Sequence, residues 1–220
     1  MHVFIAGDGP VQAKDGLASS DPTPRRSISA LLAAAMPKSE PVLYLARPGQ
    51  YASPEALTRL LPKWWTSHRY APEMTQAVSA AVRETQERYS LPKLALYGHS
   101  GGGALAVLAA PSLLPALTCL GTVASPLDTE LWTKLLGTKA LTHSLNPKSV
   151  ARRIFSVPQL YLAGGKDTVV PLEVLDSWLA GLHPLPPWIS RMVVPDAGHQ
   201  GPWLPAWRQA QTALMKQKIR

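Results

Sequence analysis

The sequence predicts an α/β fold, with a mostly parallel sheet of about six strands and helices on both of its faces. Short apolar runs alternate with helical patterns along most of the 220 residues, and a Gly or Pro lies at or just after the end of each run. Parallel strands need long crossovers, and helical crossovers cover the sheet that they connect. The length suits a single domain, which we expect over residues 1–220.

The predicted strands are apolar runs that are bounded by turn-forming residues. They lie at residues 2–6, 41–46, 93–97, 116–124, 158–165 and 189–194. Continuous rather than alternating apolarity is typical of strands that are buried on both faces. The run at 93–97 is the expected central strand.

The predicted helices lie at residues 27–35, 72–89, 101–110, 127–136, 172–182 and from 204 to about 218. In the second of these, Met74, Val78 and Val82 recur at helical spacing. Residues 11–27 form a polar, proline-bearing loop, and residues 52–71 are irregular with a helical turn near 54–60. Residues 126–155 break the alternation, and we expect them to form a small lid or to cover the end of the sheet.

Charge and composition limit the classes of partner. Twenty-two Lys and Arg residues against 14 Asp and Glu residues give a net charge of +8, which favours anionic substrates or a negatively charged surface. The basic residues are scattered or gathered at the end of the chain, and no nucleic-acid-binding motif accompanies them. We therefore expect no nucleic-acid partner.

The sequence also limits the expected location and cofactors. No apolar run reaches the roughly 18 residues that an integral membrane segment needs, and residues 1–7 do not resemble a signal peptide. The sequence by itself suggests a cytoplasmic protein, whereas a missing N-terminal leader would allow export or attachment to the envelope. Cys119 is the single cysteine, which excludes an internal disulfide and a cysteine-rich metal site. Its apolar surroundings predict a buried side chain.

Residues 93–108 carry the strongest local signal. Gly98-His99-Ser100-Gly101-Gly102 fits G-x-S-x-G between a predicted strand and a predicted helix. In that context the glycines allow a sharp turn, and the serine is presented as a nucleophile at the edge of the sheet. The alternatives are a flexible loop and a phosphate-binding loop. A phosphate-binding loop needs Lys followed by Ser or Thr, but Ala104 and Leu105 stand there.

A second turn follows the first strand, at Gly7-Asp8-Gly9. A glycine-rich turn exposes backbone N–H groups, which could stabilise a developing oxyanion. Asp8 and Gly9 are the candidate donors. An ordinary tight turn is the alternative.

Three polar residues follow three different predicted strands: Ser100, Asp167 and His199. The carboxyl ends of parallel strands meet at one edge of a sheet, so these side chains are expected to meet there. A serine hydroxyl needs an imidazole to take its proton, and that imidazole needs a carboxylate to orient it and to stabilise its cation. The three residues supply these three roles.

Each assignment has a competitor. Asp167 could cap a helix, and Asp196 is a rival acid that would have to fold back, because it shares a loop with His199. Among the other histidines, His99 is expected to point away from Ser100, and His143 is expected at the surface.

With these features the sequence resembles the α/β-hydrolase superfamily over nearly the whole chain. More narrowly, it is similar to a group of bacterial proteins with the α/β-hydrolase fold. The matching segments are Gly7-Asp8-Gly9, Asp21-Pro22-Thr23-Pro24, Ala46-Arg47-Pro48-x-Gln50-Tyr51, Gly98 to Gly102, Gly164-Gly165-x-Asp167-x-Val169-Val170-Pro171 and Gly198-His199.

The resemblance implies an oxyanion hole made by the N–H of Gly101 and that of Asp8 or Gly9. It also suggests that Asp21 and Arg47 form an ion pair or a hydrogen-bonded brace beneath the site. Two departures stand out. Gly49 stands where similar proteins often have a cysteine, and the two leading strands of a full hydrolase sheet are missing.

The expected function is that of a serine hydrolase which cleaves a carboxylic ester through an acyl-enzyme, with Ser100, Asp167 and His199 as catalytic residues. No metal or organic cofactor is expected, and the substrate is a small-molecule ester or acyl compound. The alternatives are a thioesterase or acyltransferase with the same triad, and a non-catalytic binding protein of the same fold. The sequence leaves the substrate and the oligomeric state open.

Overall fold

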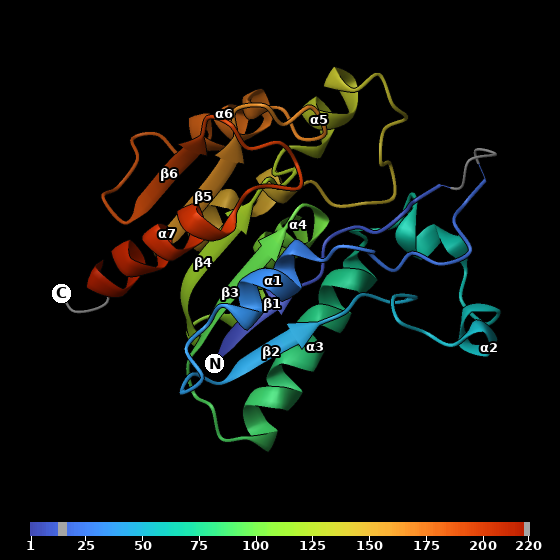
Figure 1. The fold of residues 1–220 in the computed structure, drawn as a ribbon, viewed down its shortest axis with the longest axis horizontal. Coiled ribbons are helices and arrows are strands. Elements are labelled where there is room, and N and C mark those ends of the chain that lie inside the picture. Colours follow the sequence, from blue (N-terminus) through green and yellow to red (C-terminus); the bar gives the residue numbers. More distant parts are fainter. Residues whose placement is uncertain (13–16, 218–220) are drawn as a thin grey trace.

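The computed structural model describes residues 1–12 and 17–217 (Figure 1). Residues 13–16 of the predicted loop at 11–27, and residue 218 at the end of the last predicted helix, lie outside this range. The described residues form a six-stranded sheet in the order β2-β1-β3-β4-β5-β6, in which every neighbouring pair is parallel. The predicted α/β fold is confirmed, and the sheet is wholly rather than mostly parallel.

All six predicted strands are present. They are β1 (His2–Ile5), β2 (Val42–Leu45), β3 (Leu94–His99), β4 (Leu117–Val123), β5 (Gln159–Gly164) and β6 (Ile189–Val194). The central strand β3 extends to His99, two residues beyond its predicted end, because it stays paired with β4 as far as Val123. This extension carries β3 directly into the turn at Ser100.

The predicted helices are present, and so is the helical turn predicted near 54–60. The α-helices are α1 (Ile28–Ala34), α2 (Pro54–Leu57), α3 (Pro72–Arg88), α4 (Gly101–Ala109), α5 (Thr129–Leu135), α6 (Leu172–Ala180) and α7 (Leu204–Gln217). The 3-10 helices of the described residues are η1 (Pro62–Trp65), η2 (Ala110–Leu113) and η3 (Pro147–Ile154). The 3-10 helix η3 lies within the 126–155 segment that breaks the alternation.

Local capping explains where several helices begin. Ser27 accepts a hydrogen bond from the N–H of Ala30 at the start of α1, and Asp128 accepts one from Leu131 at the start of α5. Pro72 occupies the first turn of α3, where its missing N–H costs no hydrogen bond.

The core has two layers, one on each face of the sheet. Successive side chains of a strand point to opposite faces, so Val3 and Ile5 contact one layer and Phe4 the other. Figure 1 shows α1 and α7 on one face and α3 on the other. Buried residues of α3, α4 and α6 share the layer of Val3, and those of α1 and α7 share the layer of Phe4. Cys119 is buried in the second layer, as predicted.

Within the described residues, no helix is both long enough and apolar enough to cross a membrane.

Replacing Trp207 tests how α7 is held on the sheet. Trp207 is fully buried, and its ring lies edge-on to Phe4 and Tyr97, at 5.8 and 5.0 Å between centroids. We expect Trp207→Ala to lower the free energy of unfolding by about 3–5 kcal/mol, because it leaves a cavity in the core. Urea denaturation measures this, with Gln209→Ala, an exposed position of the same helix, as the control. Equal stability of the two variants would contradict the packing described.

Candidate active site

Ser100 lies in the turn between β3 and α4, at the carboxyl edge of the sheet. Its backbone has φ 54° and ψ −131°, a left-handed conformation that non-glycine residues rarely adopt. The N–H of Ser100 donates to the carbonyl of Val123 at 2.8 Å, which ties the turn to the end of β4. The turn is thus strained and firmly held.

Two glycines allow this turn to form. A Cβ at Gly98 would lie 2.3 Å from the carbonyl carbon of Gly102, and a Cβ at Gly102 would lie 2.2 Å from the carbonyl oxygen of Ile5. Either side chain would push α4 away from the sheet. The G-x-S-x-G pattern is therefore a packing requirement at this point of the chain.

The structure brings Ser100, His199 and Asp167 together from three loops. The Ser100 Oγ lies 3.0 Å from His199 Nε2, and His199 Nδ1 lies 2.9 Å from Asp167 Oδ2. Asp167 follows β5 and His199 follows β6, so the carboxyl ends of β3, β5 and β6 position the three side chains. The contacts form a continuous hydrogen-bond chain from carboxylate to imidazole to hydroxyl.

The loop after β5 fixes the Asp167 carboxylate. Its Oδ1 accepts hydrogen bonds from the N–H groups of Val169 and Val170 at 2.8 and 2.9 Å, and its side chain is fully buried. The rival acid Asp196 is exposed and pairs instead with Lys166. Of the two predicted acids, only Asp167 contacts the imidazole.

His99 supports the main chain of His199. The His99 Nε2 donates to the His199 carbonyl at 2.8 Å, and the Trp203 Nε1 donates to the same oxygen at 3.1 Å. Because a carbonyl only accepts, His99 carries its proton on Nε2. Burial, together with the nearby charge of His199, lowers the pKa of His99 to about 4, so its ring is neutral at pH 7. Sequence reasoning missed this contact, since His99 and His199 are 100 positions apart.

The turn after β1 faces the same site. Asp8 and Gly9 line one cavity with Ser100 and His199. Gly101 is the first residue of α4, a position at which the N–H has no partner within the helix. The Asp8 carboxylate lies against Gly101, because a Cβ there would be 2.3 Å from Asp8 Oδ2. The three predicted oxyanion-hole residues are therefore neighbours.

Arg47 braces this turn, but its partner is not the predicted one. The Arg47 guanidinium forms an ion pair and a hydrogen bond with Asp8, and its Nη2 donates to the Arg69 carbonyl at 2.9 Å. The predicted pairing of Asp21 with Arg47 is wrong. Asp21 is exposed, and its carboxylate accepts a hydrogen bond from Thr23, which stabilises its own turn.

Gln50 completes the brace beneath the turn. Its amide Nε2 donates to the Gly7 carbonyl at 2.9 Å, and its Oε1 accepts from the Arg47 N–H at 3.1 Å. The conformation of residues 7–9 thus depends on two side chains of the Ala46 to Tyr51 motif.

Asp8 is held as a carboxylate within this network. Burial raises its pKa, but the charges of Arg47 and Arg69 and the hydrogen bonds from Arg47 and Tyr70 outweigh burial and hold the pKa below its ordinary value. The Tyr70 hydroxyl donates to Asp8 Oδ2 at 2.9 Å. Asp8 is therefore negatively charged beside Gly101, and Arg47 and Arg69 offset its charge.

The cavity at Ser100 has a volume of about 220 Å³. Its described lining includes apolar side chains and the charged side chains of Asp8, Arg26 and Arg69. Trp132 of α5 also lines it, so the predicted insertion at 126–155 contributes to its wall. Arg69 was missed by sequence reasoning, because residues 52–71 carry no regular pattern that would place it.

No metal site accompanies this cavity in the described part of the chain. No group of three or more His, Cys, Asp or Glu side chains in residues 1–12 and 17–217 is arranged to hold an ion.

No protein-family model and no curated protein matches the sequence. Solved structures do match the fold. TT1662 of Thermus thermophilus has 18% identity and a TM-score of 0.62, over 98% of this chain and 87% of that one. An acylaminoacyl peptidase of Pyrococcus horikoshii has 14% identity and a TM-score of 0.63, over 99% of this chain and 36% of that one.

An esterase of Pyrococcus furiosus has 15% identity and a TM-score of 0.54, over 66% of this chain and 62% of that one. The chain thus spans about a third of the peptidase and less than two thirds of the esterase. At these identities the likeness concerns the fold, which is the α/β-hydrolase fold.

Replacing His99 tests its neutral state. Unfolded histidine titrates near pH 6.5, whereas buried His99 titrates at about 4, so stability is lost as the pH falls from 6.5 toward 4. We expect the free energy of unfolding of wild type to fall by roughly 3 kcal/mol more than that of His99→Gln across this window. Urea denaturation at a series of pH values measures this. Parallel pH profiles for the two proteins would contradict the assignment.

Replacing Asp8 tests the buried ion pair. At pH 7 we expect Asp8→Asn to lose about 3–5 kcal/mol of stability, because Arg47 keeps a buried charge without a partner. The folded pKa of Asp8 is depressed, so this stabilisation is present above about pH 4 and is lost as the pH falls through the folded pKa. The difference from wild type should therefore narrow in acid. Asp21→Asn, at an exposed carboxylate, is the control, and a loss as large in that variant would refute the pairing.

Proposed function

We propose that the protein is a serine hydrolase that cleaves a carboxylic ester through an acyl-enzyme. The supporting observation is the hydrogen-bond chain from Asp167 through His199 to Ser100, at 2.9 and 3.0 Å. It ends on a serine in a left-handed turn that faces an open cavity. The fold shared with an esterase and a peptidase agrees with this proposal.

In the first half-reaction the Ser100 Oγ attacks the ester carbonyl carbon while His199 Nε2 takes the hydroxyl proton. The carbonyl oxygen becomes an oxyanion that the N–H of Gly101 and that of Asp8 or Gly9 stabilise. Collapse of this intermediate breaks the bond to the alcohol oxygen, which takes the proton from His199. The acyl group remains on Ser100.

In the second half-reaction a water molecule attacks the acyl carbon and gives a proton to His199. The new tetrahedral intermediate expels the Ser100 oxygen, which recovers that proton, and the carboxylic acid leaves. Throughout, Asp167 keeps the proton of His199 on Nδ1 and stabilises the imidazolium. The cycle thus combines nucleophilic attack by Ser100 with proton transfer through His199.

The negative charge of Asp8 would oppose an oxyanion at Gly101 if it were unpaired. Arg47 and Arg69 both form ion pairs with Asp8 and offset this charge, and Arg69 Nη1 lies 3.7 Å from Asp8 Oδ2. We therefore assign Arg47 a positioning role for the oxyanion turn.

The first test is labelling with a fluorophosphonate, in which the Ser100 oxygen bonds to phosphorus and fluoride leaves. We expect one adduct on wild type by intact mass and none on Ser100→Ala. His199→Ala should label at least about 10³-fold more slowly, and Asp167→Asn should lose about 10⁴ in kcat toward a chromogenic ester. Asp196→Asn should behave as wild type. Folded wild-type protein that takes no label would refute the proposal.

A further inference from the structure

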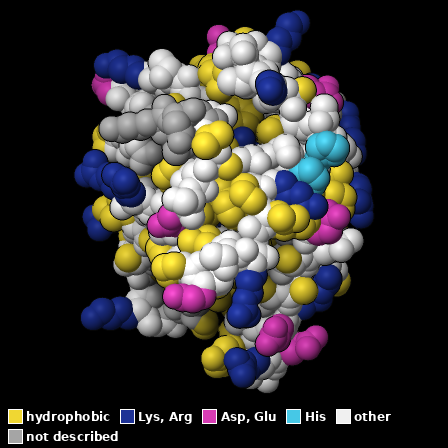
Figure 2. All heavy atoms as spheres, turned by 90° about the vertical axis from the view of Figure 1, so that its right-hand side faces the viewer, with side chains coloured by type: hydrophobic (Ala, Val, Ile, Leu, Met, Phe, Trp, Pro, Cys, Tyr) yellow, Lys and Arg dark blue, Asp and Glu magenta, His cyan; other side chains and the backbone are white. Residues whose placement is uncertain are grey.

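The cavity at Ser100 carries more positive than negative charge. Among the described residues that line it, Arg26 and Arg69 are cationic, and Asp8 is the only carboxylate. Figure 2 views the molecule from the right-hand side of Figure 1 and shows hydrophobic side chains with Lys and Arg, and also Asp and Glu, side chains around them. A cavity of this kind attracts anions.

Asp8 does not satisfy both arginines that approach it. Its carboxylate accepts hydrogen bonds from Arg47 and from the Tyr70 hydroxyl. Arg69 Nη1 stays 3.7 Å from Asp8 Oδ2, beyond hydrogen-bond distance. One carboxylate thus faces two guanidinium groups, so Asp8, Arg47 and Arg69 together keep one net positive charge. Arg26 is exposed and has no ion pair with any described residue.

The Arg69 side chain is fixed in place from two sides. Its Nε donates to the Thr66 carbonyl at 2.8 Å, and its guanidinium carbon lies 5.9 Å from the centre of the Trp132 ring. These contacts leave both Nη groups without a hydrogen bond to the described residues. The side chain is only 13% exposed, so its ends have limited contact with water outside the cavity.

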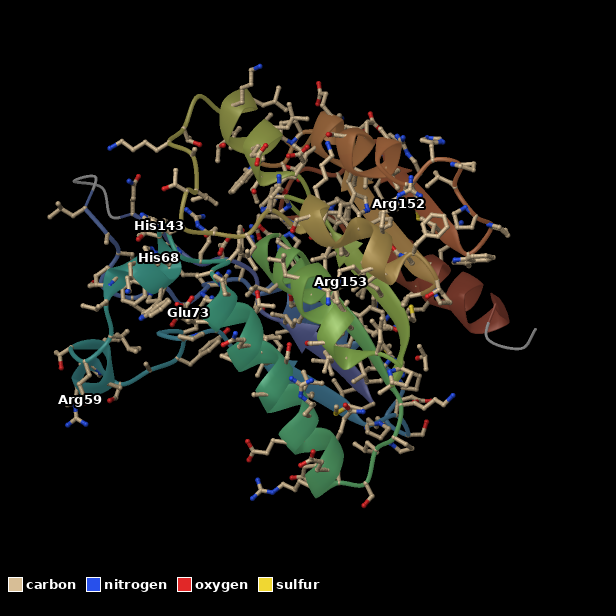
Figure 3. All side chains as sticks on the ribbon, turned by 180° about the vertical axis from the view of Figure 1, so that it is seen from behind. Arg59, His68, Glu73, His143, Arg152 and Arg153 are labelled. Atoms are coloured by element: carbon tan, nitrogen blue, oxygen red, sulfur yellow. The ribbon has the colours of Figure 1, made fainter. Side chains whose placement is uncertain are left out.

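The segment that carries Arg69 is tied to the 126–155 insertion. Ser144 Oγ donates to the Ser67 carbonyl and accepts from the Tyr70 N–H, at 2.9 and 3.1 Å. Figure 3 labels His68 and His143 beside one another, and their rings stack at 4.4 Å between centroids. Arg69 is therefore held by a braced segment, and its position is set before any ligand binds.

The free energy of removing water from the Arg69 guanidinium indicates which kind of ligand the cavity binds. A neutral acyl chain over this guanidinium would remove water from its free N–H groups and return no hydrogen bond, which is unfavourable. A carboxylate would replace that water with charge-assisted hydrogen bonds, and the guanidinium geometry suits two of them.

We propose that this cavity selects esters that also carry a carboxylate, which Arg69 binds and Arg26 attracts from the mouth of the cavity. The inference rests on the proposed serine hydrolase function, since it names the substrate class for the same site. Its substrates are half-esters of dicarboxylic acids or similar anionic esters.

A groove next to the cavity could instead hold a neutral, long acyl chain, so a neutral long-chain ester is the alternative to an ester that carries a carboxylate. It has a volume of about 750 Å³ and shares Val11, Arg69 and Trp132 with the cavity. Leu136 and Leu141 line it, but so does Lys139. Since Arg69 stands where the two spaces meet, an uncharged chain that enters the groove also covers the guanidinium.

Two phosphonate probes that differ in one charge test the proposal. Both are 4-nitrophenyl ethyl phosphonates, one with a 3-carboxypropyl group on phosphorus and the other with the methyl ester of that group. Reaction bonds the Ser100 oxygen to phosphorus and releases 4-nitrophenolate, whose absorbance gives the rate. We expect the carboxylate probe to react with wild type at least about tenfold faster, the size of one charge-assisted hydrogen bond. Added salt should reduce the preference.

Variants locate the preference. Arg69→Gln and Arg26→Gln should each lower the ratio of the two rates, and Arg69→Lys should keep part of it. A merely structural effect of Arg69 on the Asp8 turn would slow both probes alike and leave the ratio unchanged. Arg25→Gln removes one positive charge at the neighbouring exposed position, which does not line the cavity, and should leave the ratio as in wild type.

The outcomes separate this inference from the function on which it rests. Protein that reacts with a fluorophosphonate but shows no preference for the carboxylate probe overturns the carboxylate site alone. An equal loss of preference in Arg25→Gln overturns it too, because general charge would then explain the effect. Protein that reacts with neither class of reagent overturns both proposals.

Discussion

The left-handed backbone at Ser100 is the constraint on which the rest of the structure depends. Such a conformation costs of the order of 1–3 kcal/mol and persists only where its surroundings over-determine it. Here the N–H of Ser100 is bonded to the end of β4, and Gly98 and Gly102 let α4 approach β3 closely. The strain places the hydroxyl above the sheet edge, within reach of the loops after β5 and β6. Without that turn, His199 could not form its hydrogen bond to Ser100.

The buried charges of Asp8, Arg47 and Arg69 are the second feature on which the site depends. Asp8 brings a carboxylate next to the N–H of Gly101, where a negative charge would weaken any oxyanion. Arg47, Tyr70 and Arg69 surround that carboxylate and keep it ionised. The same cluster fixes the glycine turn after β1 and leaves one guanidinium facing the cavity. A structural brace and a positively charged part of the cavity wall are therefore built from one group of side chains.

The sequence predicted the fold well because its signals were local. Apolar runs, caps and glycine-rich turns reflect contacts between residues that are near one another in the chain. The proximity of Ser100, Asp167 and His199 could also be anticipated, since a parallel sheet aligns the carboxyl ends of its strands at one edge. The errors concerned partners. The resemblance suggested that Asp21 pairs with Arg47, although the partner of Arg47 is Asp8, because matching motifs do not say which of two carboxylates a guanidinium reaches.

The sequence by itself determined the strand and helix pattern, the strained turn at Ser100 and the residue types that could act beside it. Only the tertiary structure decided that Asp167, rather than Asp196, contacts His199, that His99 supports the His199 carbonyl, and that Arg69 faces the cavity. The physical reason is that hydrogen bonds and ion pairs depend on distances of a few ångströms between groups far apart in the chain. The periodicity of side chains along the sequence does not predict those distances, because the packing of the whole sheet determines them.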